Sequence, residues 1–302
     1  MPPVLATADI GSNTVHLLVG RVVTGGVQRV CNDSEWLSLG QVVSHEGEVP
    51  EALVRKLVRT IASFKAQAKA FKADKLYCFA TEAIRRAGNH GDVMNAIEKE
   101  TGVRVDMISP TREAELGLAG ALCDRPKEGK FLFAESGGGS VQVAHCLGRE
   151  ILEESSLPIG TGVLIDQSEL YEVAKEKQVE LLESLVDKSI ALLPPAYPET
   201  PVLACGGVAR GLWRALHPDG DPVLWREELE YLTGVARRLD QSTICARFGV
   251  KPKRADTLLP GSIIYRRLLD YARVSHLTVS LYGVREGALL EMSEGRLEGF
   301  RL

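Results

Sequence analysis

The chain lacks a long apolar run and an excess of basic residues, and each absence excludes a class of protein. No apolar run approaches the roughly 20 residues that a membrane span needs, so we expect no membrane contact. The 36 basic and 40 acidic residues give a net charge of -4. This balance gives no reason to expect a nucleic acid as a partner, and any basic groove for a polyanion must be local.

Cysteine pairs and a leader pattern are missing as well. The six cysteines lie in separate segments without a C-x-x-C pair, and most have apolar neighbours, as in Tyr77-Cys78-Phe79. This is typical of reduced core cysteines. The first residues lack the basic segment and the long apolar stretch of a signal peptide. We therefore expect a cytoplasmic protein.

The sequence does contain the pattern of two α/β domains, each opening with strands and continuing with alternating helices and strands. The 302 residues, 45% of them hydrophobic, are enough for two cores. We expect domains at 1–122 and 123–302, joined near 123–130, with the last helix packing back on the first domain. The predicted strands are 4–8, 15–22, 75–80, 103–108, 131–134, 141–147, 150–156, 202–205 and 277–281. The main predicted helices are 50–72, 92–100, 111–123 with Thr111 as its cap, 178–193, one from 209, 226–239, 242–248, 262–273 and 287–292.

Two short stretches, one near the start of each half, share an order of acid, glycine and hydroxyl residues. They are Asp9-Ile-Gly-Ser-Asn-Thr14 and Glu135-Ser-Gly-Gly-Gly-Ser140. Glycine lets a backbone pass close to an anion, and N–H groups in a turn can point at phosphate oxygens. An acid at the tip of a strand can hold a hard cation. We expect phosphate contacts from seven residues of these loops, the alternative being ordinary hairpin turns: Gly11, Ser12, Asn13, Gly137, Gly138, Gly139 and Ser140.

Eight short blocks that run nearly end to end resemble the exopolyphosphatase/guanosine pentaphosphate phosphohydrolase (Ppx/GppA) family, in its order and at its spacing. The blocks are Asp9–Asn13, Ala80–Arg85, Ile108–Leu116, Ser136–Ser140, Leu157–Gly160, Gly206–Gly207, Arg254–Asp256 and Tyr282–Gly287. The resemblance implies an α/β fold of the actin-like ATPase superfamily, with two ribonuclease-H-like lobes and a cleft between them.

The resemblance also implies roles for individual residues. Glu113 would activate the attacking water, although an acid in the first turn of a helix is common for the helix dipole alone. Asp9 and Glu135 would hold Mg²⁺ or another divalent cation; the alternative for Asp9 is an acid that fixes its own turn. Arg85 would pair with a phosphate, with a surface salt bridge as the competing interpretation.

Two positions depart from the family's pattern. The family has aspartate where this chain has Glu135 and glutamate where it has Gln142. Glu135 keeps the charge on a longer side chain, whereas Gln142 loses the charge and keeps an acceptor oxygen. For Gln142 we expect a polar residue on the open face of a strand.

Together these features predict a phosphohydrolase that releases terminal phosphate from inorganic polyphosphate, from guanosine pentaphosphate (pppGpp), or from both. The alternative from another class is a regulatory protein that binds (p)ppGpp or a nucleotide with little turnover, because the second-loop acids are altered. An actin-like kinase is a third option, which would transfer phosphate from ATP to an acceptor. The expected partner is thus inorganic polyphosphate or guanosine penta- or tetraphosphate; a homodimer is left open.

Overall fold

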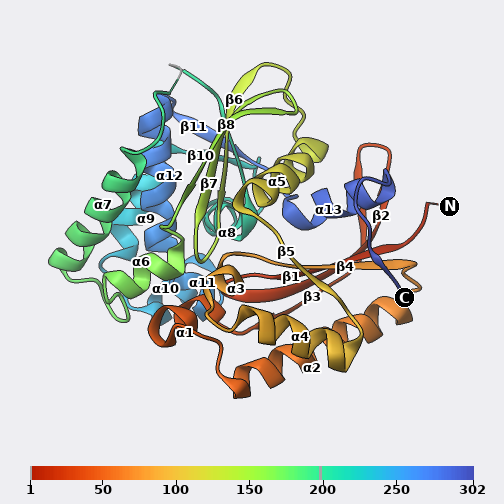
Figure 1. Cartoon of the computed structure of the whole chain (residues 1–302). Coiled ribbons are helices and arrows are strands. Elements are labelled where there is room, and N and C mark those ends of the chain that lie inside the picture. The colour runs from red at the N-terminus through yellow and green to blue at the C-terminus, as the bar shows by residue number, and fades with distance from the viewer. Residues whose placement is uncertain (1, 197–198) are drawn as a thin grey trace. The chain divides into compact units, whose positions relative to one another are not determined.

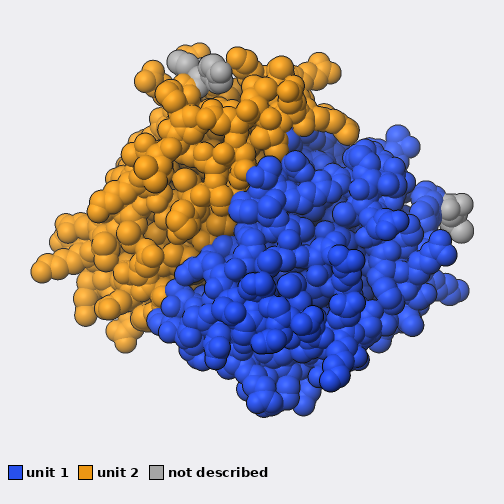
Figure 2. Space-filling model, viewed as in Figure 1, with its two compact units in different colours: residues 1–124, 282–302 blue, residues 125–281 orange. Residues whose placement is uncertain are grey.

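The computed structural model describes residues 2–196 and 199–302, which divide into two compact units (Figure 1). Unit 1 comprises the chain up to Asp124 together with Tyr282–Leu302, and unit 2 comprises Arg125–Leu281 (Figure 2). The C-terminal segment therefore belongs with the N-terminal strands. In the described ranges no helix combines the length and the apolarity needed to cross a bilayer.

Unit 1 is built on a six-stranded mixed sheet. Its strands are β1 (Leu5–Ile10), β2 (Thr14–Val23), β3 (Gly26–Trp36), β4 (Lys75–Ala80), β5 (Val105–Met107) and β12 (Phe300–Arg301). Its helices are α1 (Leu39–Glu46), α2 (Glu51–Ala70), α3 (Glu82–Arg86), α4 (His90–Thr101), α5 (Pro110–Asp124) and α13 (Val284–Ser293). Strands β1, β4 and β5 run parallel, whereas β2 and β3 form antiparallel hairpins beside β1.

Helices cover both faces of this sheet, with α2 and α4 on one face and α5 and α13 on the other (Figure 1). Alternate residues of a strand point to opposite faces. Accordingly Ala6 and Ala8 pack in the core with α2, while Leu5 packs in a second core with Leu116 of α5 and Leu289 of α13. Helix α2, predicted at 50–72, turns Leu57, Ile61 and Phe64 toward the first of these cores.

Unit 2 repeats the plan with another six-stranded mixed sheet. Its strands are β6 (Lys130–Ser136), β7 (Val141–Leu147), β8 (Glu150–Leu157), β9 (Val202–Cys205), β10 (Val223–Trp225) and β11 (His276–Val279). Its helices are α6 (Thr161–Gln167), α7 (Glu176–Ile190), α8 (Gly206–Leu216), α9 (Arg226–Ala236), α10 (Gln241–Phe248), α11 (Pro252–Ala255) and α12 (Leu258–Ala272). Here β6, β9 and β11 run parallel, and β7 and β8 continue as antiparallel hairpins.

The prediction that Thr111 caps α5 is wrong, because the helix begins at Pro110. The Ser109 hydroxyl accepts a hydrogen bond from the backbone N–H of Arg112 at 3.1 Å, and the Ser109 carbonyl accepts one from the N–H of Glu113 at 2.9 Å. Proline suits the first position of a helix because its missing N–H would have no partner there. The cap is therefore Ser109, and Glu113 still lies in the first turn.

Helices α5 and α13 pack with their backbones in contact at two glycines. A Cβ atom on Gly287 would lie 1.8 Å from the carbonyl oxygen of Leu116, and one on Gly120 would lie 2.1 Å from that of Gly283. No side chain larger than hydrogen fits at either position unless the helices separate. This contact fixes α5, the helix that carries Glu113, against α13.

Candidate functional site

In unit 1 the candidate residues gather at the carboxyl ends of three parallel strands, the usual ligand-binding edge of such sheets. Asp9 lies at the end of β1, Arg85 lies in α3 directly after β4, and Glu113 lies in α5 after β5. Backbone hydrogen bonds fasten these connections together. The N–H of Thr81 donates to the carbonyl of Ile10 at 3.2 Å, and the N–H of Ile108 donates to that of Ala80 at 3.1 Å.

The first glycine loop holds its carbonyl groups against the start of α1. Within the turn, the N–H of Gly11 donates to the carbonyl of Thr14 at 3.2 Å. The carbonyl of Ser12 accepts from the N–H of Gly40 at 2.7 Å, and that of Asn13 accepts from two N–H groups just before α1, both at 3.0 Å. Within the described ranges, the N–H groups of Ser12 and Asn13 donate to no protein atom.

The second glycine loop is built in the same way against the start of α6. The N–H of Gly137 donates to the carbonyl of Ser140 at 2.9 Å, which closes the turn. The three glycine carbonyls then accept hydrogen bonds from N–H groups of 160–163: Gly137 from Thr161 at 3.0 Å, Gly138 from Gly162 at 2.9 Å and Gly139 from Gly160 at 3.1 Å. The N–H groups of Gly138 and Gly139 donate to no acceptor in the described part of the chain.

This shared geometry suits an anion. Carbonyl oxygens would repel a phosphate, and in both loops they are turned toward a helix start and neutralised there. The N–H groups that remain available are those of Ser12, Asn13, Gly138 and Gly139. Successive free N–H groups in a turn form an anion-binding concavity. Gly11 and Gly137 use their N–H inside the turn, so their part in each loop is to close it.

Arg85 and Glu113 form an ion pair in unit 1. Guanidinium Nη2 lies 3.3 Å from carboxylate Oε2, and the two side chains are 17% and 16% exposed. Nη1 also donates to the carbonyl of Ile108 at 2.6 Å, which anchors the guanidinium at the end of β5. Separate roles are predicted for these two residues, and the structure brings them together in a half-buried pair rather than on the open surface.

Asp9 is a half-buried residue with one buried carboxylate oxygen that lacks a hydrogen bond within residues 2–196 and 199–302. Its Oδ1 has no hydrogen-bond partner among the described residues. Burial raises the pKa of Asp9 to about 6, while the nearby charge of Arg285 lowers this pKa and that of Glu286 raises it. An acceptor-only oxygen held out of water suits a hard cation. Glu135 is half-buried. Its Oε1 would lie 3.1 Å from a Cβ atom added to Gly206.

The carboxylates of the candidate residues suit a divalent cation that arrives bound to a phosphate ligand better than a cation held permanently by the protein. Among the described residues no group of three or more His, Cys, Asp or Glu side chains is placed to hold a metal ion. Mg²⁺ is commonly bound by one or two carboxylates together with substrate phosphates and water. Single carboxylates such as Asp9 and Glu135 match that mode.

The prediction that Gln142 lies on an open strand face is wrong. Its side chain is buried, with 1% of its surface exposed, and it is paired across the sheet with Glu135. Its amide Nε2 donates to the hydroxyl of Ser140 at 3.1 Å. Strand alternation gives the face on which a residue lies but not whether that face is covered.

Two residues that support the loops were not predicted from the sequence. The buried hydroxyl of Tyr265, from α12, accepts from the N–H of Ser136 at 3.3 Å and donates to the carbonyl of Cys205 at 3.3 Å. It therefore bridges the ends of β6 and β9. In unit 1, Glu82 accepts a hydrogen bond from the Ser12 hydroxyl at 3.1 Å. Both contacts join residues far apart in the chain, so no local pattern marks Tyr265; Glu82 does lie within the Ala80–Arg85 block.

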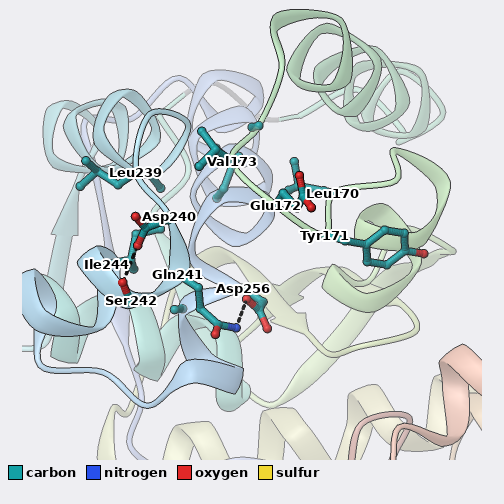
Figure 3. Close-up of a pocket in the computed structure, with 14 residues that line it drawn as sticks. Leu170, Tyr171, Glu172, Val173, Leu239, Asp240, Gln241, Ser242, Ile244 and Asp256 are labelled. Atoms are coloured by element: carbon teal, nitrogen blue, oxygen red, sulfur yellow. Dashed lines mark hydrogen bonds between the residues drawn. The ribbon is translucent and has the colours of Figure 1, made fainter.

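A pocket of about 540 Å³ in unit 2 is a separate feature (Figure 3). Leu239, Ile244 and Leu259 contribute apolar surface, and Asp240 and Asp256 contribute carboxylates. Its lining, all within the described ranges, includes none of the candidate site residues and no lysine or arginine. The charge of this pocket would repel a polyphosphate, so it is not a candidate for the phosphate site.

Comparisons with known proteins identify the family of the chain. The model of the Ppx/GppA phosphatase family matches residues 18–295. The protein named exopolyphosphatase 1 of Mycobacterium leprae is 27% identical over 312 residues, which cover 99% of this chain and 92% of that protein. The protein named guanosine-5'-triphosphate,3'-diphosphate pyrophosphatase of Photobacterium profundum is 22% identical over 299 residues, which cover 96% of this chain and 59% of that protein.

The fold has a counterpart among solved structures. The crystal structure of the Aquifex aeolicus member of the Ppx/GppA family superposes with a TM-score of 0.83 at 24% identity, covering 98% of this chain and 99% of that one. This confirms the predicted α/β fold of two ribonuclease-H-like lobes, the fold of the actin-like ATPases. Since the family model matches more than nine-tenths of its length, the chain belongs to the Ppx/GppA phosphatase family.

Proposed function

We propose that the chain releases the terminal phosphate of inorganic polyphosphate, of pppGpp, or of both. Membership of the Ppx/GppA phosphatase family makes it a hydrolase of phosphoanhydrides. The single observation that carries the finer proposal is the set of four available N–H groups in two loops of identical design. Phosphoryl oxygens accept hydrogen bonds from N–H donors presented this way, whereas a cationic group, which only donates, does not.

We assign Glu113 as the residue that accepts a proton from the attacking water. Cleavage of a phosphoanhydride requires charge neutralisation, an aligned water and a group that orients or deprotonates that water. Glu113 is a half-buried carboxylate at the ligand-binding edge of the unit 1 sheet. Its partner Arg85 has a planar fork that pairs equally well with a phosphate, so an incoming phosphoryl group competes for the guanidinium.

Asp9 and Glu135 are the carboxylates that we assign to Mg²⁺ or another divalent cation. When bound, such an ion neutralises charge on the phosphate chain and polarises the phosphoryl oxygens. The protein's own contribution is to keep acceptor oxygens free of competing donors, and Oδ1 of Asp9 meets that requirement.

Replacing Asp9 with asparagine is expected to make the metal-free protein more stable and to abolish phosphate release. With its pKa raised to about 6, the charged carboxylate costs the folded state roughly 3 kcal/mol at pH 8, and an amide avoids part of this cost. We expect the free energy of unfolding at pH 8, measured with urea, to rise by about 1–2 kcal/mol. A variant that is less stable, or that retains Mg²⁺-dependent release, would contradict the assignment.

A second candidate function is regulation by binding of (p)ppGpp or a nucleotide with weak turnover or none. Two observations favour it: Gln142 is uncharged, and Arg85 is already occupied by Glu113. The chain retains Glu113, which such a protein would not need.

Phosphate release from tripolyphosphate, long-chain polyphosphate and pppGpp distinguishes these functions. We expect Mg²⁺-dependent release from at least one of the three and none in EDTA. Direct binding of ppGpp is measured beside it by calorimetry. Tight ppGpp binding without phosphate release at micromolar enzyme concentration would contradict the hydrolase function and support the regulatory one. Phosphate transfer from ATP to an acceptor would indicate a kinase.

A further inference from the structure

Gln142 is an unusual residue to find buried beside a phosphate loop. It lies on β7, two residues after Ser140, with 1% of its surface exposed. Its Oε1 is buried and has no hydrogen-bond partner in the described part of the chain. A buried amide with an unmade hydrogen bond is costly. An aliphatic side chain would avoid that cost, so the amide has a use in this position.

The role of the Gln142 amide follows from which atoms of Gln142 and Ser140 can donate a hydrogen bond and which can accept one. An amide nitrogen only donates, whereas a serine hydroxyl has one proton to donate and two lone pairs that accept. Gln142 Nε2 donates to Ser140 Oγ at 3.1 Å, which occupies a lone pair of the hydroxyl. The proton of Ser140 must therefore point to a different acceptor, and no residue in the described ranges accepts a hydrogen bond from this hydroxyl.

We propose that Gln142 is a positioning residue that makes Ser140 a dedicated hydrogen-bond donor to a phosphoryl oxygen. This rests on the proposed function of the Gly137–Ser140 loop. Ser140 adds a third donor to the N–H groups of Gly138 and Gly139 in the same loop, and its orientation is set before the ligand arrives. A carboxylate at position 142 would reverse the direction of the hydrogen bond between residues 142 and 140. It would accept the serine proton and leave the lone pairs of the hydroxyl facing an anionic ligand.

A double-mutant cycle tests this coupling. Affinity for tripolyphosphate is measured by calorimetry with Mg²⁺, in the Glu113→Gln background so that turnover does not consume the ligand. We expect Ser140→Ala to weaken binding by about 10-fold, the lower end for a hydrogen bond to a charged group. Gln142→Glu should weaken binding at least as much. In the Gln142→Glu background, Ser140→Ala should then cost less than about 2-fold.

Two controls separate this effect from others. Gln28→Glu adds the same charge on an exposed position of β3 and should leave affinity unchanged. Gln142→Met keeps the volume without a donor or a charge, so it serves if the buried glutamate impairs folding. In that background Ser140→Ala should again cost less than in the parent, because the hydroxyl is no longer held in one orientation. Urea midpoints of all variants report their folding.

The outcomes that overturn the proposal are distinct. If Ser140→Ala weakens tripolyphosphate binding by the same factor in all backgrounds, Gln142 does not orient the hydroxyl. Tighter binding or faster turnover in Gln142→Glu would mean that this position acts through the cation instead. The proposed function is judged separately, from phosphate release by the wild type: binding with coupling but without release would overturn the function and support this inference. Absence of any tripolyphosphate binding by the parent would overturn both.

Discussion

Replacing Glu113 with glutamine lowers the turnover number by about 10²–10⁴-fold and leaves the affinity for polyphosphate or pppGpp within a few-fold of wild type. The magnitude is the usual contribution of a general base. Glutamine keeps the shape and an acceptor oxygen for Arg85, whose guanidinium lies 3.3 Å from the carboxylate, so the local structure is retained. What the variant loses is the ability to take a proton. The measurement is steady-state phosphate release together with calorimetric binding of the same substrate.

Glu115→Gln is the matched control for this change. Glu115 lies on the same helix two residues away, its side chain is 47% exposed, and it pairs with Arg112 at 2.9 Å. The same loss of charge there should alter turnover by less than about 2-fold, because a surface ion pair contributes little. Equal turnover in Glu113→Gln and wild type would remove Glu113 from the mechanism. Loss of binding in that variant would make it a ligand-binding residue instead.

Replacing Gly287 with alanine destabilises unit 1 by about 3 kcal/mol or more. The added Cβ would lie 1.8 Å from the backbone carbonyl oxygen of Leu116, and no flexible side chain can move to make room. When an added side chain forces two backbones apart, the loss in free energy of unfolding lies at the upper end of the range for small-to-large substitutions. Because α5 and α13 pack through this contact, the helix that carries Glu113 is displaced as well. Urea unfolding and phosphate release should both register the change.

Gly91→Ala is the control for the glycine substitution. Gly91 also lies in a helix of unit 1, and a Cβ there would meet no atom within 4 Å. Alanine has the higher helix propensity, so this variant should be at least as stable as wild type, by up to about 1 kcal/mol. If Gly287→Ala and Gly91→Ala unfold at the same urea concentration, the tight packing of α5 on α13 is contradicted.

The regular elements of the fold were predictable from the sequence because their patterns are local. The apolar residues along α2 and the apolar run of β4 can be recognised from short segments of the sequence. Gly102, with a positive φ of 66°, marks the end of α4. Strand β3, which follows the turn at Gly25 and Gly26, was not among the predicted strands. The repeated order of such elements gave the two-lobe α/β fold.

The parts of the site that escaped prediction depend on contacts distant in sequence. Nothing near Gly138 indicates that residues 160–163 neutralise the loop carbonyls, because the interaction exists only after β7 and β8 have returned the chain. Short helices such as α1, α6 and α11 were missed because seven or eight residues, or fewer, carry too little periodicity. Tyr265 reaches the second loop from α12, and its hydrophobic surroundings made it look like an ordinary core residue.

The two-loop assignment is tested most directly by the backbone amide resonances of the loops in ¹H–¹⁵N spectra during titration with tripolyphosphate and Mg²⁺. The four amides that donate to no protein atom are those of Ser12, Asn13, Gly138 and Gly139. We predict that all four shift downfield and saturate, while Gly11 and Gly137, whose protons stay inside their turns, move less. Saturating shifts elsewhere, with these four amides unmoved, would contradict the assignment.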